Sequence, residues 1–132
     1  MASFRANGSI APSRFVKTDT SAADGHVVQC GAGDKIVGIS QEGTRRAPLD
    51  GWDDGFCAKA GEGLQVYTPY DCDYCWLETG AAVTRDDLLK ADANGKGVTT
   101  TTENDEVGAV AMETASGSGI LIKVKPRFRT NV

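Results

Sequence analysis

The chain contains one sequence pattern twice, and this duplication decides the expected fold. The first copy reads Phe15-Val16-Lys17-Thr18-Asp19, then Gly25, then Asp34-Lys35-Ile36-Val37-Gly38-Ile39. The second copy reads Leu88-Leu89-Lys90-Ala91-Asp92, then Gly95, then Asn104-Asp105-Glu106-Val107-Gly108-Ala109-Val110. Each copy then passes through small residues into a further apolar run, Gly61 to Tyr67 and Gly117 to Ile122 respectively. Short apolar runs between glycine turns predict strands, so the pattern favours a small all-β body built by duplication.

The domain organisation follows from length and composition. With 132 residues, the chain is expected to form one domain. Its 16 glycines have no fixed period, which is typical of many turns. No stretch has the 3.6-residue periodicity of a long amphipathic helix, although Thr84 is a candidate cap for one short helical turn. We expect an extended arm over residues 1–13, a β body over 14–125 and an exposed basic tail over 126–132.

The two copies differ by an insertion in the first one. Gly38 to Gly63 spans 25 positions and Gly108 to Gly119 spans 11, which gives an insertion of 14 residues. Long insertions lie on surface loops that often carry function. This insertion contains Trp52 and Phe56, which either fold back as a lid on the core or anchor a partner. An aromatic, acidic connector over residues 70–76 is the second difference.

Charge and hydropathy exclude several classes of function. The net charge of −4 argues against general nucleic-acid binding, which requires a high density of basic groups. No segment approaches the length of a membrane span, and the first residues lack the apolar core of a signal peptide, so synthesis in a cytoplasm is expected. Basic residues gather near both ends of the sequence and acidic residues in its middle. These are either ordinary solvated faces or basic arms that dock on an acidic surface, including that of a neighbouring copy.

The residues that could carry chemistry form no complete site. Cys72 and Cys75 make a C-x-x-C pair, but a zinc site needs a second pair or a histidine nearby, and a redox site needs a βαβ context. Unlinked thiols are favoured over a disulfide bridge. His26 is the only histidine and opens an expected strand. The Asp-Asn-Gly clusters at 50–55 and 92–95 lack the full ligand series of a calcium loop. We therefore expect no enzyme activity, no cofactor and no metal.

The pattern of the second copy resembles the small capsid cement, or head decoration, proteins of tailed bacteriophages. The resemblance rests on Gly80-Ala81-Ala82-Val83-Thr84, Asp87 to Asp92, Gly95 and Val107 to Glu113, together with Phe15-Val16-Lys17 and Ile36 to Ser40 of the first copy. It implies a β-barrel or β-tulip-like body, forming a homotrimer on the outer capsid surface of the virion. It also implies that this trimer clamps neighbouring subunits of the major capsid protein, with no direct contact to nucleic acid or membrane.

Candidate contact residues follow from the resemblance and from the segregated charges. We expect the arm and the tail to touch the capsid or a neighbouring copy through Phe4, Arg5, Arg14, Arg127, Phe128 and Arg129, with Trp52 and Phe56 as the second choice. On this interpretation, removal of residues 1–13 weakens capsid binding while the body still folds. An alternative function is a carbohydrate- or host-surface-binding module that uses Trp52, Tyr70, Tyr74 and Trp76 as stacking platforms.

Overall fold

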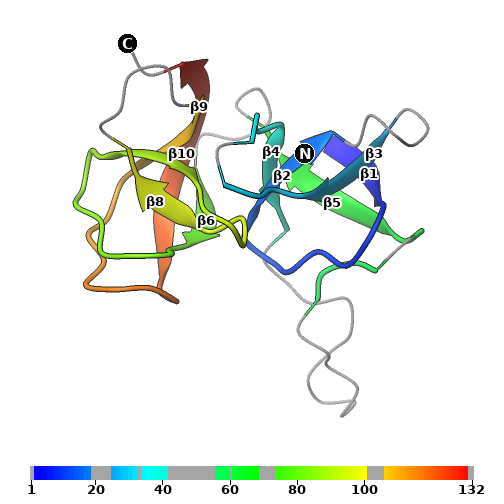
Figure 1. Ribbon diagram of the computed structural model, residues 1–132, viewed down its shortest axis with the longest axis horizontal. Helices are drawn as coiled ribbons and strands as arrows, with labels where there is room; N and C mark the ends of the chain where they lie inside the picture. Colours follow the sequence, from blue (N-terminus) through cyan, green and yellow to red (C-terminus); the bar gives the residue numbers. More distant parts are fainter. Residues whose placement is uncertain are drawn as a thin grey trace.

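The structure of the chain is a computed structural model that describes residues 2–18, 25–32, 34–41, 56–59, 61–68, 74–100 and 106–130 (Figure 1). These residues form ten strands and no helix, which confirms the all-β prediction. No helix in this part of the chain could therefore cross a membrane. The strands are β1 (Ala2–Ala6), β2 (Phe15–Thr18), β3 (His26–Gln29), β4 (Gly38–Ser40), β5 (Gly63–Tyr67), β6 (Cys75–Glu78), β7 (Leu88–Ala91), β8 (Gly97–Thr99), β9 (Glu106–Ala111) and β10 (Leu121–Thr130).

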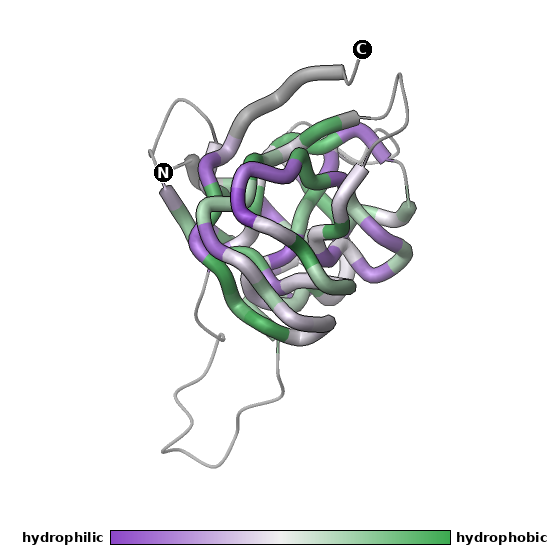
Figure 2. Tube along the Cα trace, turned by 90° about the vertical axis from the view of Figure 1, so that its left-hand side faces the viewer, coloured by the Kyte–Doolittle hydropathy of each residue, from purple (hydrophilic) through white to green (hydrophobic). Residues whose placement is uncertain are grey.

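The first half of the molecule, strands β1 to β5, is a closed barrel in the order β1-β3-β2-β4-β5. The antiparallel pair β1–β5 and the parallel pair β1–β3 close it. Alternate residues point inward, as a half-buried strand requires: Leu64 and Val66 of β5 are buried, whereas Gly63 and Gln65 are exposed. Hydrophobic and hydrophilic segments therefore alternate along the chain (Figure 2).

The second half, strands β6 to β10, repeats the first half strand by strand. Its order is β6-β10-β9-β7-β8, and its closing contact is a single parallel bridge between Thr79 and Gly97. The register is the same in both halves: Phe4–Leu64 corresponds to Leu77–Ile122, Val16–Gly38 to Leu89–Ala109, Lys17–Val28 to Lys90–Val98, Ser40–Val66 to Ala111–Val124, and Ala6–Val27 to Thr79–Gly97. The duplication read from the sequence is confirmed, and it includes β1 and β6.

Backbone conformations at the turns repeat as well. Gly25 and Gly95 hold equivalent places and have φ of 84° and 77°. Gly61 and Gly119 likewise have φ of 86° and 78°, and their N–H groups donate to the carbonyl oxygens of Ala6 and Thr79 at 2.8 and 2.7 Å. Left-handed conformations of this kind favour glycine because it has no Cβ. Glycine at these positions is therefore set by the repeated turn geometry.

Three sequence-based boundaries are wrong. The arm expected over residues 1–13 contains β1, which pairs with β3 and β5 inside the barrel. The tail expected after Pro126 continues as β10 and pairs with β9 as far as Thr130. The connector over 70–76 runs into β6, which pairs with β10. Each missed segment lacks a strong apolar run, and pairing with a partner strand supplies what the local sequence does not.

Two smaller expectations are also corrected. In the register of the strands, Gly38 corresponds to Ala109 and Gly63 to Leu121. Gly38 to Gly63 spans 25 positions and Ala109 to Leu121 spans 12, so the insertion in the first half has 13 residues rather than 14. Thr84 begins a turn and not a helix. Asp87 donates its N–H to the Thr84 carbonyl at 3.0 Å, and its side chain accepts from the Thr84 N–H at 2.8 Å. The carboxylate thus caps the turn in place of the threonine hydroxyl.

The two halves are joined where a segment of the first half enters the second. In the first half, the Arg5 N–H donates to the Gly25 carbonyl at 2.9 Å. In the second half, the equivalent Glu78 N–H donates instead to the Ser13 carbonyl at 2.9 Å, and the equivalent Gly95 carbonyl accepts from the Phe15 N–H at 2.8 Å. We call Ser13 to Phe15 the corner of the first half, and the gap between Glu78 and Gly95 the seam of the second.

A shared hydrophobic core extends this junction. Residues from the outer face of the first barrel pack into the same cluster as the interior of the second half, the first-half members being Phe15, Cys30, Ile36 and Ile39. A second cluster, containing Val16, Val27, Leu64 and Val66, fills the first barrel. At Gly108, an added Cβ would lie 2.5 Å from Ile36 Cδ1 and 2.7 Å from Phe15 Cε1, so glycine is what allows the halves to approach. The junction is therefore continuous core, not a linker contact.

Removal of residues 1–13 is now expected to unfold the protein. The deletion takes away β1 and Ile10, which is fully buried. Truncation of one buried isoleucine to alanine alone costs about 2–5 kcal/mol, so loss of the whole strand exceeds what a small domain tolerates. Circular dichroism should show no cooperative thermal transition, whereas Arg5→Ala, on the exposed side of β1, should melt as the parent does. A truncated chain that melts cooperatively at the parent temperature would contradict the role given to β1.

Candidate interaction surfaces

The sequence-predicted residues of the N-terminal segment lie in or against the barrel. Phe4 is half-buried and packs against the core of the first half. Arg5 is exposed, and its Nη1 donates to the Gly61 carbonyl at 3.0 Å. Arg5 is thus available on the surface, whereas Phe4 mainly contributes to packing.

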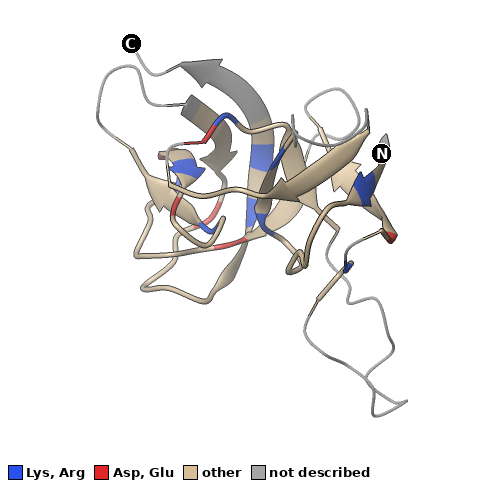
Figure 3. Cartoon of the chain, turned by 45° about the vertical axis from the view of Figure 1, so that its right-hand side comes forward, with Lys and Arg blue, Asp and Glu red and all other residues tan. Residues whose placement is uncertain are grey.

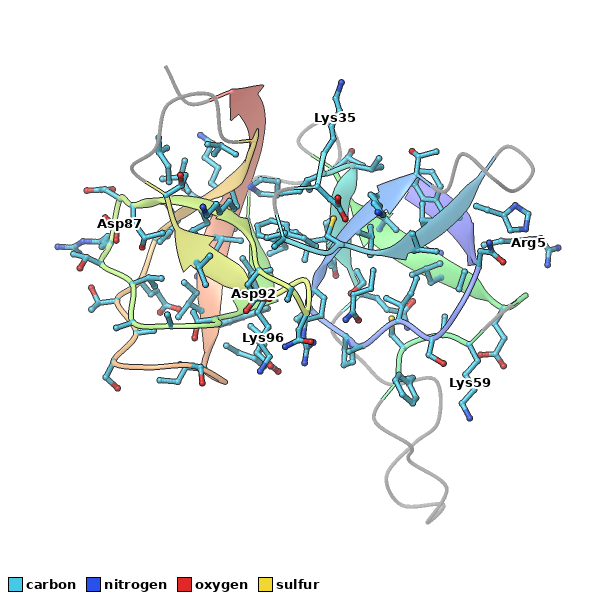
Figure 4. All side chains as sticks on the ribbon, in the orientation of Figure 1. Arg5, Lys35, Lys59, Asp87, Asp92 and Lys96 are labelled. Atoms are coloured by element: carbon cyan, nitrogen blue, oxygen red, sulfur yellow. The ribbon has the colours of Figure 1, made fainter. Side chains whose placement is uncertain are left out.

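Arg14 is engaged inside the molecule, at the junction of the halves. Its Nη2 lies 3.0 Å from Glu78 Oε2 and its Nη1 donates to the Asn94 carbonyl at 2.9 Å. Lys96 Nζ approaches the same Glu78 oxygen at 3.1 Å, and Figure 4 places Lys96 near the boundary between the halves. Only 16% of the Arg14 side chain is exposed. We therefore withdraw Arg14 from the set of candidate contacts with a partner.

The remaining predicted contact residues are only partly covered by the structure. Phe56 is half-buried, with Lys59 Nζ 5.9 Å from its ring centroid. Trp52 lies outside the described residues. Arg127, Phe128 and Arg129 belong to β10, so their backbone is part of the sheet, and their side chains are outside the described part. For these residues the role as partner contacts stays a prediction.

An exposed apolar and basic face, which the sequence analysis missed, lies along β6 and β10. Among the described residues, the large hydrophobic side chains with the greatest exposure are Tyr74, Ile120 and Leu121, at 51%, 37% and 52%. Lys123 and Lys125 are exposed on β10 between the buried Ile122, Val124 and Pro126. Figure 3 shows the Lys and Arg positions of the described chain in blue. We call these five exposed residues the β6–β10 face. The signal for this face in the sequence is the alternation of exposed and buried residues along 121–126.

A small groove adjoins this face where the two halves meet. It has a volume of about 100 Å³ and is lined by Tyr67, Tyr74, Cys75, Trp76 and Lys123. Lys123 Nζ lies 6.0 Å from the centroid of the Tyr74 ring, within reach of a cation–π interaction. Two of the predicted stacking residues, Tyr74 and Trp76, are thus brought together, whereas Trp52 and Tyr70 lie outside the described residues.

The cysteines of the described chain are buried thiols. Cys30, Cys57 and Cys75 are thiols outside any disulfide and are between 2% and 4% exposed. Burial raises the pKa of Cys30 to about 12 and that of Cys57 to about 11. The residues 74–100 do not include Cys72, so the C-x-x-C pair is only half described. No group of three or more His, Cys, Asp or Glu side chains in the described ranges is placed to hold a metal ion.

Arg14→Ala should destabilise the protein by about 1–3 kcal/mol, because Glu78 and the Asn94 carbonyl would each lose a charged donor at a half-buried site. Urea unfolding measures this free energy. The matched control is Lys17→Ala, which removes an ion pair with Asp34 whose side chains are 37% and 33% exposed, and about 0–1 kcal/mol is expected there. Equal losses for the two variants would show that Arg14 has no special role at the junction.

In the folded protein at pH 8, the three buried thiols should resist alkylation. The raised pKa values of Cys30 and Cys57 mean that their reactive thiolates form only as the pH approaches 12 and 11, and burial excludes the reagent from all three thiols. Mass spectrometry of a Cys72→Ser variant after iodoacetamide treatment should show no adduct in buffer and three in guanidinium chloride, one at each of Cys30, Cys57 and Cys75. Rapid labelling of Cys30 or Cys75 in the folded variant would mean that the junction opens readily, because both belong to the shared core.

Comparisons with known proteins give a structural likeness alone. No family model matches the sequence, and no curated protein matches it. Among solved structures, the chain is similar to the crystal structure of the head fiber gp8.5 N base in bacteriophage phi29, with a TM-score of 0.62 and 14% sequence identity. The match covers 99% of this chain and 95% of that chain. The two therefore share a fold over nearly their whole length.

Proposed function

We propose that this chain is a non-enzymatic structural protein of a bacteriophage head. The observation that carries the proposal is the likeness to the N base of a phage head fiber, at a TM-score of 0.62 over 99% of the chain. The resemblance of its sequence pattern to capsid cement proteins points in the same direction. In this role the chain binds the outer surface of the capsid as a homotrimer, stabilises contacts between major capsid protein subunits, and needs no cofactor. It is made in the host cytoplasm and resides on the virion.

The construction of the molecule suits this role. Two halves with one continuous core form a rigid body, and a rigid body that bridges two subunits loses little conformational entropy on binding. Many copies on one capsid lattice also gain from effective concentration, so each contact can be weak.

The β6–β10 face is the surface that we propose for the capsid contact. Exposed apolar side chains mark interaction sites. Ile120 and Leu121 lie at one end of the β6–β10 pair, opposite Glu78, and Tyr74 lies at the other end, with Lys123 and Lys125 between them on β10. Such a face fits a partner surface that carries both apolar and acidic groups. Arg127, Phe128 and Arg129 follow on the same strand, so the predicted tail contacts would extend this face.

A second candidate function is binding of a saccharide in the aromatic groove. Its support is that Tyr67, Tyr74 and Trp76 line a groove of about 100 Å³ together with Lys123. Aromatic rings stack on the apolar face of a sugar, and a lysine would favour an anionic one. The groove and the β6–β10 face share Tyr74 and Lys123, so the same surface could bind either a saccharide or the capsid.

Leu121→Asp should weaken binding to expanded capsids by about tenfold or more, because it places a charge at the most exposed apolar residue of the β6–β10 face. Co-sedimentation of the purified protein with capsids measures the affinity. Ala82→Asp is the matched control, since it adds the same charge at another exposed position. Equal affinity of the two variants would rule out this face.

A glycan array separates the two candidate functions. Hits that disappear with Trp76→Ala support the saccharide function, whereas the capsid role expects no hits.

A further inference from the structure

In the contact between the two halves, one half supplies a corner and the other supplies a seam. Each half has both a corner and a seam. The corner of the first half, Ser13 to Phe15, enters the seam of the second half between Glu78 and Gly95. By the shared register, the second half has its own corner at Asp86 to Leu88, and the first half has its own seam between Arg5 and Gly25. Within one chain, the junction uses only one corner and one seam.

The second corner has the same backbone as the first. Ser13 and Asp86 are equivalent, with φ of 55° and 76°, and in the described chain they are the non-glycine residues with positive φ. The Arg14 carbonyl accepts from the Ser40 N–H at 2.8 Å, and the equivalent Asp87 carbonyl accepts from the Ala111 N–H at 2.9 Å. A left-handed backbone is costly for a residue with a side chain, so its presence in both halves indicates that the shape itself is required.

At the unused corner and the unused seam, the charges are reversed relative to those at the junction. In the junction, the cation Arg14 on the corner meets the anion Glu78 on the seam at 3.0 Å. The residue equivalent to Arg14 is Asp87, and the residue equivalent to Glu78 is Arg5. The unused corner therefore carries the anion and the unused seam carries the cation. The two remain complementary, and neither would suit the partner that the junction already uses.

The apolar side chains around the second corner are less covered than their counterparts. Phe15 and Ile39 of the first half are 0% exposed because the second half packs on them. Their equivalents, Leu88 and Val110, are only half-buried. On the first half, the position equivalent to the tightly packed Gly108 is Val37, which lines an open groove of about 360 Å³ with Lys17, Thr18, Lys35 and Ile36.

Arg5 and Asp87 cannot meet within one molecule, because they lie at opposite ends of its long axis (Figure 4). We propose that the corner Asp86 to Leu88 of one copy inserts into the Arg5–Gly25 seam of a second copy of this chain, head to tail. Asp87 of one copy then pairs with Arg5 of the next, as Arg14 pairs with Glu78 inside each chain.

The seam of the first half must lose its hydrogen bond between the Arg5 N–H and the Gly25 carbonyl before it can accept this corner. The Arg5 N–H would leave the Gly25 carbonyl and bond the incoming Asp86 carbonyl, while the Gly25 carbonyl would accept from the incoming Leu88 N–H. One hydrogen bond is thereby replaced by two, and the Ala6–Val27 bridge stays, as its equivalent Thr79–Gly97 does in the second half. Such insertion of an extended segment between strands is a common mode of recognition.

A head-to-tail contact repeats until it closes into a ring or extends as a filament. The inference deepens the proposed function, on which it rests for the number of copies, since the homotrimer proposed there would be a closed ring of three chains. Each ring would present six similar halves, joined alternately by Arg14–Glu78 within chains and by Asp87–Arg5 between them.

Charge reversal tests the contact on the purified chain without a capsid. Light scattering should show self-association of the parent protein at high concentration. Arg5→Asp and Asp87→Arg should each raise the dissociation constant by about tenfold or more, and the double variant should recover the parent value. Arg85→Asp, which changes the neighbouring exposed cation, should leave association unchanged.

Folding of the variants is checked by thermal melting, and Asp87→Asn supplies a milder change that keeps an oxygen near the Thr84 N–H. It should weaken association without lowering the melting temperature by more than the control does. The proposal is overturned if the parent stays monomeric at high concentration, or if the folded single variants associate as the parent does. Capsid binding by such variants would still support the proposed function, so failure of one idea is distinguishable from failure of the other.

Discussion

Insertion of Ser13 to Phe15 between Glu78 and Gly95 is the interaction on which the rest of the molecule depends. It gives the second half the backbone partners that its own strands do not provide, through two hydrogen bonds of 2.9 and 2.8 Å. It also places the Phe15 ring in the second core and the Arg14 guanidinium against Glu78. Because backbone, apolar and ionic contacts all meet at one segment, the second half completes its structure only with the first half in place.

Duplicated halves with one register have thus acquired different tasks. The positions that correspond to Phe15 and Arg14 are Leu88 and Asp87, which keep the corner but change its size and its charge. Where the first half closes through Arg5 and Gly25, the second closes around a foreign segment. A shared backbone with divergent side chains lets one fold supply both a donor and an acceptor surface, which is the requirement for joining units in a fixed order.

The distribution of chemistry in the molecule is consistent with a role in assembly. Buried positions are occupied mainly by aliphatic residues and by thiols whose pKa is raised by burial. The charged groups discussed above lie instead at three places. Arg14 and Glu78 lie at the junction, Arg5 and Asp87 lie at the two ends of the molecule, and Lys123 and Lys125 lie on β10. Surfaces of this kind recognise partners through shape, backbone pairing and charge.

The sequence by itself determined the all-β class and the duplication, because short apolar runs between glycine turns leave a local signature at Gly25, Gly95 and their neighbours. It aligned Gly38 with Gly108, whereas the strand pairing makes Gly38 equivalent to Ala109, so the register was decided by the tertiary structure. It placed Ile10 in an extended arm and Pro126 in an exposed tail, although both residues are buried. It misread β1, β6 and the end of β10 as arm, connector and tail, since their strand character comes from pairing with segments far away in the chain. Among the candidate contacts it identified Arg5 as a surface cation, yet it could not separate Arg5 from Arg14. Only the tertiary structure decided that Arg14 forms an ion pair with Glu78 at the junction, because the contact between the two residues depends on how one half inserts into the other.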